Sequence, residues 1–280
     1  MTVFPKISIV TPSFNQAQFL EETILSVVNQ NYPNLEYIII DGGSTDGSVE
    51  IIKKYEKYLT YWISEVDSGQ SDAINKGLSR CTGDIFAWIN SDDFYEIEVF
   101  EKIAKIFINN KRTIINGDCR LINEEGKEFE IIKSKECDLY RLLNFSVGYS
   151  IPPQPSIFVP VSCIKKVGYL DTGLHYAMDY DLWLRLIRNF KFTYIPEILS
   201  NYRFHSRSKS VMENGFIKFI PEWTFVRDRF LSKQNVYNRM KYKIEIYYRK
   251  TNCNQSKFKI FVKIILGKFI KRYDLSTRFS

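Results

Sequence analysis

Over its first half the chain alternates short apolar segments with segments of helical periodicity, and this alternation limits the fold more than any other feature. The apolar segments are KISIVTP, LEYIIID, LTYWISE and GDIFAWIN, and helical spacing lies between them, as in NQAQFLEETILSVVNQ. Strands that alternate with helices in this order form a mostly parallel sheet with right-handed crossovers. The sequence therefore predicts an α/β fold with flanking helices and disfavours an antiparallel sandwich.

The alternation weakens in the second half of the chain. SIPPQPSIFVP contains four prolines, which predicts an extended, irregular segment. AMDYDLWLRLIRNF returns to helical spacing, whereas FTYIPEILSNYRFH is expected to form short extended pieces. From about Asn214 the chain is mainly helical and basic. We therefore divide it into a main domain over residues 1–212 and a basic helical C-terminal extension over residues 213–280.

The charges are distributed unevenly along the chain. Its net charge is +7, but residues 201–280 carry 19 Lys and Arg against 5 Asp and Glu, so an acidic body precedes a basic tail. SKFKIFVKIILGKFIKRY places most of its apolar residues on one helical face, which predicts an interfacial helix on an anionic membrane surface. A helix packed against the main domain fits this pattern nearly as well. No nucleic-acid-binding module accompanies the charge, so nucleic-acid binding is not expected.

The cysteines and the N-terminus bear on the location of the protein. The five cysteines are widely spaced and include no CxxC pair, which disfavours a disulfide framework or a zinc site and fits a reducing cytoplasm. No signal-peptide pattern is present, and no apolar run approaches the roughly 18 to 20 residues of a transmembrane helix. We expect a cytoplasmic protein, with peripheral attachment to the cytoplasmic face of the membrane as an option.

Polar residues follow each of the four predicted strands, at the ends that meet on one edge of a parallel sheet. These ends are Thr11-Pro12-Ser13, Asp41-Gly42-Gly43-Ser44, Glu65-Val66-Asp67 and Asn90-Ser91-Asp92-Asp93. Turns and helix caps explain each motif alone, but together the motifs predict an acidic cleft. Hard oxygen ligands suit Mg²⁺ or Mn²⁺, which usually takes one or two carboxylates plus phosphate oxygens, so a metal–diphosphate ligand is expected. No P-loop or GxGxxG motif is present.

Two stretches, ISIVTPSFNQAQFLEETILSVVNQNYPNLEYIIIDGGSTDGS and SEVDSGQSDAINKGLSRCTGDIFAWINSDD, strongly resemble glycosyltransferase family 2. The resemblance is most specific over residues 6–95 and extends more weakly to about residue 210. It implies an inverting GT-A glycosyltransferase with a Rossmann-like catalytic domain over residues 1–212. It also implies a nucleotide-diphospho-sugar donor, most often a UDP-sugar, with Mn²⁺ or Mg²⁺. A glycan or lipid-linked glycan is the expected acceptor, as in polysaccharide biosynthesis.

The resemblance also assigns donor-binding residues by position. They are Thr11, Pro12, Ser13, Asp41, Ser44, Asp72, Asn90, Ser91 and Asp92. A departure from the family pattern is Ile74, where many relatives carry an Arg that neutralises the diphosphate. Lys76 is one residue that could compensate, and the metal is the alternative.

NSDD resembles the DxD-type metal motif of the family, with Asn90 in place of the first Asp. Metal binding is therefore expected to rest on Asp92, with Asp93 as the close alternative. His205 resembles a late histidine of the family that approaches the metal or the diphosphate. Three basic residues beside it are candidates for closing over the phosphates: Arg203, Arg207 and Lys209.

An inverting transfer is a single displacement that needs a base for the acceptor hydroxyl and an electrophile for the leaving diphosphate. HYAMDYDLWLRL offers Asp179 and Asp181, either of which could instead cap the helix. The resemblance favours Asp179 as the catalytic base, because it matches the second position of a Glu-Asp pair whose Glu is replaced by Met178. On the acceptor side, Gln154 is the candidate for a hydrogen bond to a sugar, and Trp183 is a candidate platform or a core residue.

Two other function classes remain open. A nucleotidyltransferase also uses acidic strand ends and a metal, but it would release pyrophosphate. A non-catalytic nucleotide-sugar-binding or assembly protein is suggested by the departures at Asn90, Ile74 and Met178.

Overall fold

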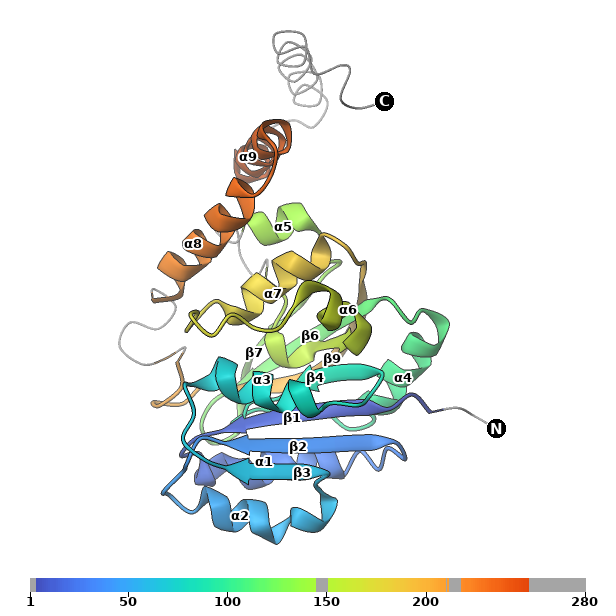
Figure 1. The fold of residues 1–280 in the computed structure, drawn as a ribbon, viewed down its shortest axis with the longest axis vertical. Coiled ribbons are helices and arrows are strands. Elements are labelled where there is room, and N and C mark those ends of the chain that lie inside the picture. The colour runs from blue at the N-terminus through green and yellow to red at the C-terminus, as the bar shows by residue number, and fades with distance from the viewer. Residues whose placement is uncertain (1–3, 145–150, 210, 212–217, 252–280) are drawn as a thin grey trace.

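A computed structural model describes residues 4–144, 151–209, 211 and 218–251 (Figure 1). Within this part of the chain one sheet runs in the order β3-β2-β1-β4-β8-β6-β9-β5, with β7 paired to β6. The strands are β1 (Ile7–Ser13), β2 (Leu35–Asp41), β3 (Tyr61–Ser64), β4 (Ile85–Trp88), β5 (Phe94–Tyr95), β6 (Ile114–Ile122), β7 (Glu128–Ile132), β8 (Ile157–Pro160) and β9 (Phe192–Arg203). The α-helices are α1 (Ala17–Val28), α2 (Ser48–Lys54), α3 (Gln70–Arg80), α4 (Val99–Asn109), α5 (Leu139–Leu143), α6 (Val161–Val167), α7 (Met178–Ile187), α8 (Phe219–Ser232) and α9 (Val236–Thr251). Two 3₁₀ turns complete the order, η1 (Glu56–Tyr58) and η2 (Gln154–Ser156).

The first four strands form the parallel part of the sheet. β1 pairs in parallel with β2 on one side and β4 on the other, and β2 pairs with β3. The predicted parallel sheet with flanking helices is therefore confirmed over the first half of the chain. The register sets Ser13 beside Asp41 and Asp41 beside Ser64, so these strand ends lie at one edge.

The second half of the chain adds strands where the sequence predicted irregular structure. The proline-rich segment ends in β8, which pairs antiparallel with both β4 and β6. The prediction of an irregular segment is wrong for 157–160, because the prolines lie in the preceding turn and at the last strand position, Pro160. Such positions lose no central ladder hydrogen bond. FTYIPEILSNYR forms one strand of 12 residues rather than short pieces, with a register shift that absorbs Pro196 and Glu197.

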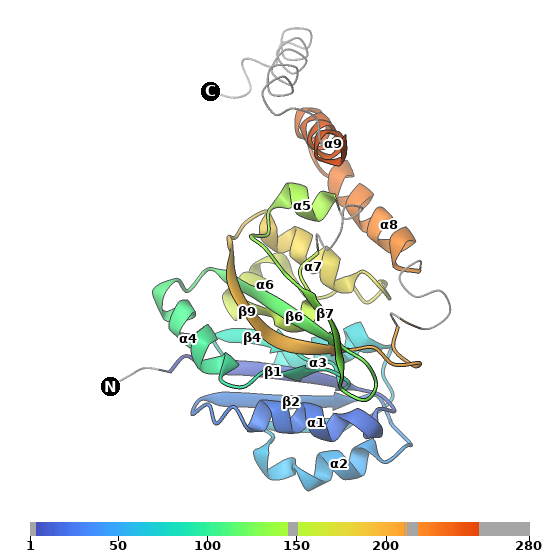
Figure 2. The same cartoon turned by 180° about the vertical axis from the view of Figure 1, so that it is seen from behind.

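Alternate side chains of the central strands enter two separate cores. Ile38 and Ile40 of β2 lie in the core with α3 and α7, whereas Tyr37 and Ile39 lie in the core with α1 and α4. Figure 1 shows α3, α6 and α7 in front of the sheet, and Figure 2 shows α1 and α2 on the opposite face. Because both faces are covered, β2 is continuously apolar from Tyr37 to Ile40.

The C-terminal helices follow the main domain. α8 packs against α7 through Val226, which is 1% exposed, and α9 meets α5, where the rings of Tyr140 and Tyr242 lie 5.7 Å apart. In the described part of the chain, no helix is both long and apolar enough to cross a bilayer. The predicted interfacial helix over 256–273 lies outside the described residues.

Candidate active site

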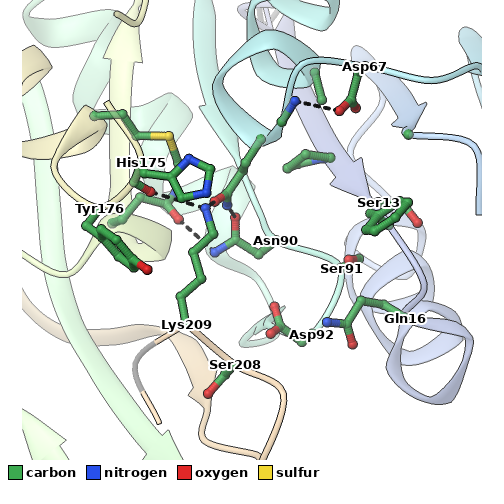
Figure 3. A pocket seen from close by; sticks show the side chains of 18 of the residues that line it. Ser13, Gln16, Asp67, Asn90, Ser91, Asp92, His175, Tyr176, Ser208 and Lys209 are labelled. Carbon is green, nitrogen blue, oxygen red and sulfur yellow. Dashed lines mark hydrogen bonds between the residues drawn. The ribbon is translucent and has the colours of Figure 1, made fainter. Parts of the chain in front are cut away.

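The carboxyl ends of β1 and β4 open into a cavity of about 610 Å³. The start of α3, the loop before α7 and the segment after β9 form its other walls (Figure 3). Nine of the residues predicted from the sequence line it: Pro12, Ser13, Asn90, Ser91, Asp92, Gln154, Asp179, Arg207 and Lys209. The fold therefore brings together residues from both halves of the chain around one space.

Asp92 lines this cavity, and His205 lies behind it as its partner without lining the cavity itself. Oδ2 of Asp92 lies 2.9 Å from Nε2 of His205, whose ring is 3% exposed and packs against Phe19. One carboxylate and one imidazole are a donor set that Mn²⁺ accepts when phosphate oxygens complete its coordination. Among the described residues, no cluster of three or more His, Cys, Asp and Glu side chains gathers at one point. The pair therefore fits a metal that the protein shares with a diphosphate.

Asp93 faces away from the cavity. Its carboxyl group is 1% exposed and accepts hydrogen bonds from the Arg203 backbone N–H (2.9 Å) and from Asn90 Nδ2 (3.1 Å). Burial, together with the charge of Asp92, raises the pKa of Asp93 well above its ordinary value. The prediction of Asp93 as an alternative metal ligand is therefore wrong, because its two oxygens tie β4 to β9.

Asp41 and Ser44 stabilise a loop rather than line the cavity. Oδ2 of the fully buried Asp41 accepts hydrogen bonds from the N–H groups of Gly43 and Ser44 and from Ser64 Oγ. Oδ1 accepts another from Ser44 Oγ at 2.6 Å. Gly43 has a φ of +83°, which a glycine adopts without strain. The predicted donor contacts of Asp41 and Ser44 are thus replaced by bonds that shape residues 42–44 beside the cavity.

Thr11 and Asp72, also predicted to bind the donor, lie outside the cavity. Thr11 is fully buried, and its Oγ1 lies 3.1 Å from the hydroxyl of Tyr37. Asp72 accepts a hydrogen bond from the Ser68 N–H and forms a 3.4 Å ion pair with Lys76. Lys76 therefore does not supply the positive charge that Ile74 lacks, because its amine is held on the outer side of α3.

Trp183 is a core residue. It is 0% exposed and stacks on Trp88 with ring centroids 5.6 Å apart. Of the two alternatives predicted for this side chain, the core residue is confirmed and the acceptor platform is not. Gln154 does line the cavity, but its Nε2 donates to the Trp88 carbonyl (2.8 Å) and its Oε1 accepts from Asn90 (3.4 Å).

Asp67 and Lys209, both in segments that the sequence singled out, also line the cavity, whereas Tyr176 and Phe219 line it and were missed from the sequence. Asp67 follows β3 and accepts the Gly69 N–H at 2.7 Å; its place at an acidic strand end was the available signal. Lys209 enters from the segment after β9, and its amine donates to Gln70 Oε1 (2.9 Å) and to the His175 carbonyl (3.2 Å). Figure 3 shows the Lys209 side chain extending across the cavity toward His175. Burial lowers its pKa, although nearby carboxylates oppose the shift.

The three basic residues beside His205 divide into two roles. Lys209 and Arg207 line the cavity. Arg203 is 3% exposed, and its guanidinium bonds the Asp92 carbonyl and pairs with Glu22. Arg203 therefore supports the wall of the cavity and is not available to phosphates.

Asp179 and Asp181 stand in different environments at the start of α7. Asp179 lines the cavity, and its Oδ1 accepts the N–H of Tyr180 at 2.7 Å. Burial raises the pKa of Asp179 to about 6. Asp181 instead pairs with Arg185 (2.8 Å) and Arg229 (2.7 Å). Of the two acids, only Asp179 is available to a molecule in the cavity.

Comparison with known proteins shows which sequence family this chain resembles. The sequence model of glycosyl transferase family 2 matches residues 8–164. A Rickettsia typhi protein named a glycosyltransferase is 27% identical over 98% of this chain and 85% of its own length. Another glycosyltransferase by name, from Rickettsia bellii, is 32% identical over 75% of this chain, which spans only 31% of that longer protein.

Solved structures show the same GT-A fold. S. aureus TarS in complex with UDP-GlcNAc has a TM-score of 0.68 at 16% identity, over 90% of this chain and 74% of that one. The mannosyltransferase PcManGT from Pyrobaculum calidifontis, in complex with GDP-Man and Mn²⁺, has a TM-score of 0.57 at 13% identity, over 98% of this chain and 88% of that one. With the fold, the cavity and the family match in agreement, the chain belongs to glycosyl transferase family 2.

Proposed function

We propose that this glycosyltransferase moves a sugar from a UDP-sugar to a hydroxyl group of a glycan or lipid-linked glycan, with inversion at the anomeric carbon. The observation that carries the proposal is that Asp92 and Asp179 line one cavity from β4 and α7. TarS, the neighbour with the higher TM-score, was solved with UDP-GlcNAc, which supports a UDP-sugar here. Ser13 Oγ and Gln16 Oε1 are buried without a hydrogen-bond partner among the described residues and would meet the nucleoside.

Asp179 is the base of the proposed reaction. Its carboxylate takes the proton of the acceptor hydroxyl as that oxygen bonds to the anomeric carbon and the bond to the diphosphate oxygen breaks. A pKa of about 6 leaves the carboxylate ionised at neutral pH while keeping it more basic than an ordinary Asp. The nucleoside diphosphate leaves with the electron pair of the broken bond.

Asp92 and His205 would hold Mn²⁺ or Mg²⁺ through a carboxylate oxygen and an imidazole nitrogen. When bound, the ion neutralises the charge that develops on the leaving diphosphate. Lys209 supports the same task, because its amine reaches into the cavity between the walls that carry Asp92 and Asp179. With Ile74 fully buried in place of an Arg, this lysine is the cation that we assign to the diphosphate.

Two aromatic side chains beside Asp179 replace Trp183 as the proposed acceptor platform. Tyr176 and Phe219 both line the cavity, with ring centroids 5.0 Å apart. Aromatic rings supply a large apolar contact with a polar tip, which suits the C–H face and hydroxyl rim of a sugar. We assign Gln154 to bracing Asn90 at the end of β4 rather than to the acceptor.

The test is mass-spectrometric detection of nucleoside diphosphate released from a panel of nucleotide-sugars with Mn²⁺. Wild type is expected to release UDP from one UDP-sugar, and Asp92→Ala and Asp179→Asn are expected to lose this activity. Asp228→Asn is the control, since this exposed carboxylate pairs with its neighbour Arg227 outside the cavity, and the variant should keep the turnover. Pyrophosphate as the product, or full activity of Asp179→Asn, would refute the proposal.

A further inference from the structure

One carboxylate from the C-terminal extension binds the loop that leads into Asp179. Glu222, in the first turn of α8, accepts hydrogen bonds from three consecutive backbone N–H groups. They belong to His175 (3.0 Å to each oxygen), Tyr176 (2.6 Å) and Ala177 (2.9 Å). Ala177 is the N-cap residue of α7, so the bound loop ends two residues before Asp179.

This contact brings a hydrogen-bond acceptor to the N-terminal end of α7, where the cap residue has none in its side chain. The first N–H groups of a helix have no partner inside the helix, and a side chain of the cap residue usually satisfies one of them. Ala177 offers no such side chain, and α7 has no side-chain cap bond of its own. A carboxylate is the preferred partner, because it bonds strongly to N–H groups and complements the positive end of the helix dipole. Glu222 therefore binds the N–H of the N-cap residue and the two N–H groups before it, and its charge lies at the positive end of α7.

Two further contacts fix α8 in the position that this requires. Val226 is 1% exposed and belongs to the core that includes α7. Arg229 reaches Asp171 and Asp181, each at 2.7 Å. Glu222 is thus held at one end of a helix that is anchored one and two turns further along.

The loop that Glu222 binds contributes to both sides of the proposed reaction. Tyr176 lines the cavity at the acceptor side, and the His175 carbonyl accepts a hydrogen bond from Lys209 at 3.2 Å. A displacement of this loop would move Asp179 and release Lys209 together. Errors of about 1 Å in catalytic groups can cost on the order of 100-fold in rate.

We propose that Glu222 is a positioning residue for sugar transfer: it fixes residues 175–177 so that Asp179 and Lys209 keep their places in the cavity. Glu222 itself does not line the cavity, so it acts through the loop rather than on a substrate. The inference rests on the proposed function, because the rate it affects is that of the transfer. It also gives α8 a part in catalysis, although this helix lies beyond the residues that the family model matches.

The experiment compares Glu222→Gln with Asp228→Asn in the full chain. Both changes remove one negative charge from α8, but Asp228 is exposed and pairs with its neighbour Arg227. Glu222→Gln is expected to lower kcat for nucleoside diphosphate release about 10- to 100-fold, with the donor KM changed by less than about threefold. Asp228→Asn should stay within about twofold of wild type. Glu222→Asp, which keeps the charge on a shorter side chain, should fall between them.

Two readouts separate positioning from general stability. Hydrogen exchange of the amides of residues 175–177 should become faster in Glu222→Gln, whereas amides of β1 should keep their rates. The acid limb of the kcat profile should also shift from that of wild type, because the charge of Glu222, which raises the pKa of Asp179, is removed and that of Lys209, which lowers it, is displaced.

The outcomes distinguish this inference from the proposed function. If wild type releases no nucleoside diphosphate, the proposed function fails, and the exchange measurement alone still decides whether Glu222 holds the loop. If wild type is active and Asp179→Asn is inactive, an unchanged kcat or unchanged amide exchange in Glu222→Gln overturns the positioning role only. If Glu222→Gln does not fold, Glu222→Asp is measured in its place. Unchanged kcat or unchanged amide exchange in that variant then overturns the positioning role.

Discussion

Nε2 of His205 lies 2.9 Å from Oδ2 of Asp92, although 113 positions separate the two residues in the chain. The contact joins the end of β4 to the segment that follows β9. Because the imidazole is almost completely buried, its position is set by packing against Phe19 as well as by Asp92. A metal held by the two side chains, as proposed, would replace the hydrogen bond between them.

His205→Ala should weaken Mn²⁺ binding by at least about tenfold, because it removes one of the two protein ligands. Isothermal titration of Mn²⁺ in the presence of UDP measures this directly. The folded fraction, checked by circular dichroism, should stay close to that of wild type. An affinity within threefold of wild type would argue against His205 as a ligand.

Turnover should rise with pH through about 6, because the reaction needs the ionised form of Asp179 and burial raises the pKa of this group to about 6. An unperturbed aspartate would place the same rise near pH 4. The check is kcat for nucleoside diphosphate release between pH 4.5 and 8.5 at saturating donor and Mn²⁺. A profile that is flat down to pH 4.5 would contradict the assignment.

Asp179→Asn should stabilise the protein at pH 8 while abolishing transfer. The folded-state pKa of about 6 exceeds the unfolded value of roughly 3.9, so ionisation destabilises the fold, progressively from about pH 4 and fully above pH 6. Removing the charge should raise the free energy of unfolding at pH 8 by about 1 to 2 kcal/mol, and by almost nothing at pH 3.5. Urea denaturation at the two pH values tests this. A loss of stability at pH 8 would mean that the carboxylate is favourable there.

Glu36→Gln should destabilise the protein at neutral pH. Burial alone would raise the pKa of Glu36, but hydrogen bonds from Lys6, Ser8 and Thr82 outweigh it and lower the pKa to about 2. The unfolded value is roughly 4.3, so the stabilisation is complete above that pH and is lost as the pH falls toward 2. We expect a loss on the order of 2 kcal/mol at pH 7 that shrinks toward pH 2, measured by urea denaturation. Glu101→Gln is the control. Glu101 forms an exposed ion pair with Lys105 on one helix, so this substitution should change the free energy of unfolding little.

Truncation should separate the two parts of the C-terminal extension. A chain that ends at residue 251 keeps α8 and α9 and should retain transfer, but it should lose affinity for anionic vesicles if the segment after it binds membrane. A chain that ends at residue 212 lacks the buried Val226 and the Arg229 ion pairs, so it should lose transfer and unfold more easily. Vesicle sedimentation measures the membrane affinity of the two truncated chains, and the nucleoside diphosphate assay measures their transfer activity. Unchanged vesicle binding after truncation at 251 would remove the predicted membrane contact.

The parallel half of the fold could be predicted from the sequence because each strand there carries its own signal. LEYIIID is continuously apolar from Tyr37 to Ile40, and the polar ends of β1 and β4 reach the cavity as expected. β8 could not be predicted in the same way. Its four residues follow three prolines, and only the neighbouring β4 and β6 make the segment a strand.

The site residues could be predicted where they belong to contiguous family motifs, and less well where their role depends on contacts with residues far away in the sequence. Asp92 and Asp179 both line the cavity, but adjacent acids cannot be separated by pattern, so Asp93 was given a role that its burial excludes. Asp41 was predicted to bind the donor because the sequence motif is the same whether the carboxylate accepts hydrogen bonds from a loop or from a donor. Glu222 carries no local signal, since its three partners lie 45 to 47 positions away.

The distance in sequence between Glu222 and the loop it binds has a consequence for synthesis. Chains grow from the N-terminus, and the parallel strands and α7 leave the ribosome before α8 does. Until Glu222 has emerged, the N–H groups of residues 175–177 have water as their partner, and Asp179 sits on an unsupported turn. If Glu222 positions this loop as proposed, the nascent chain would acquire its sheet first and its catalytic competence only after α8 has emerged.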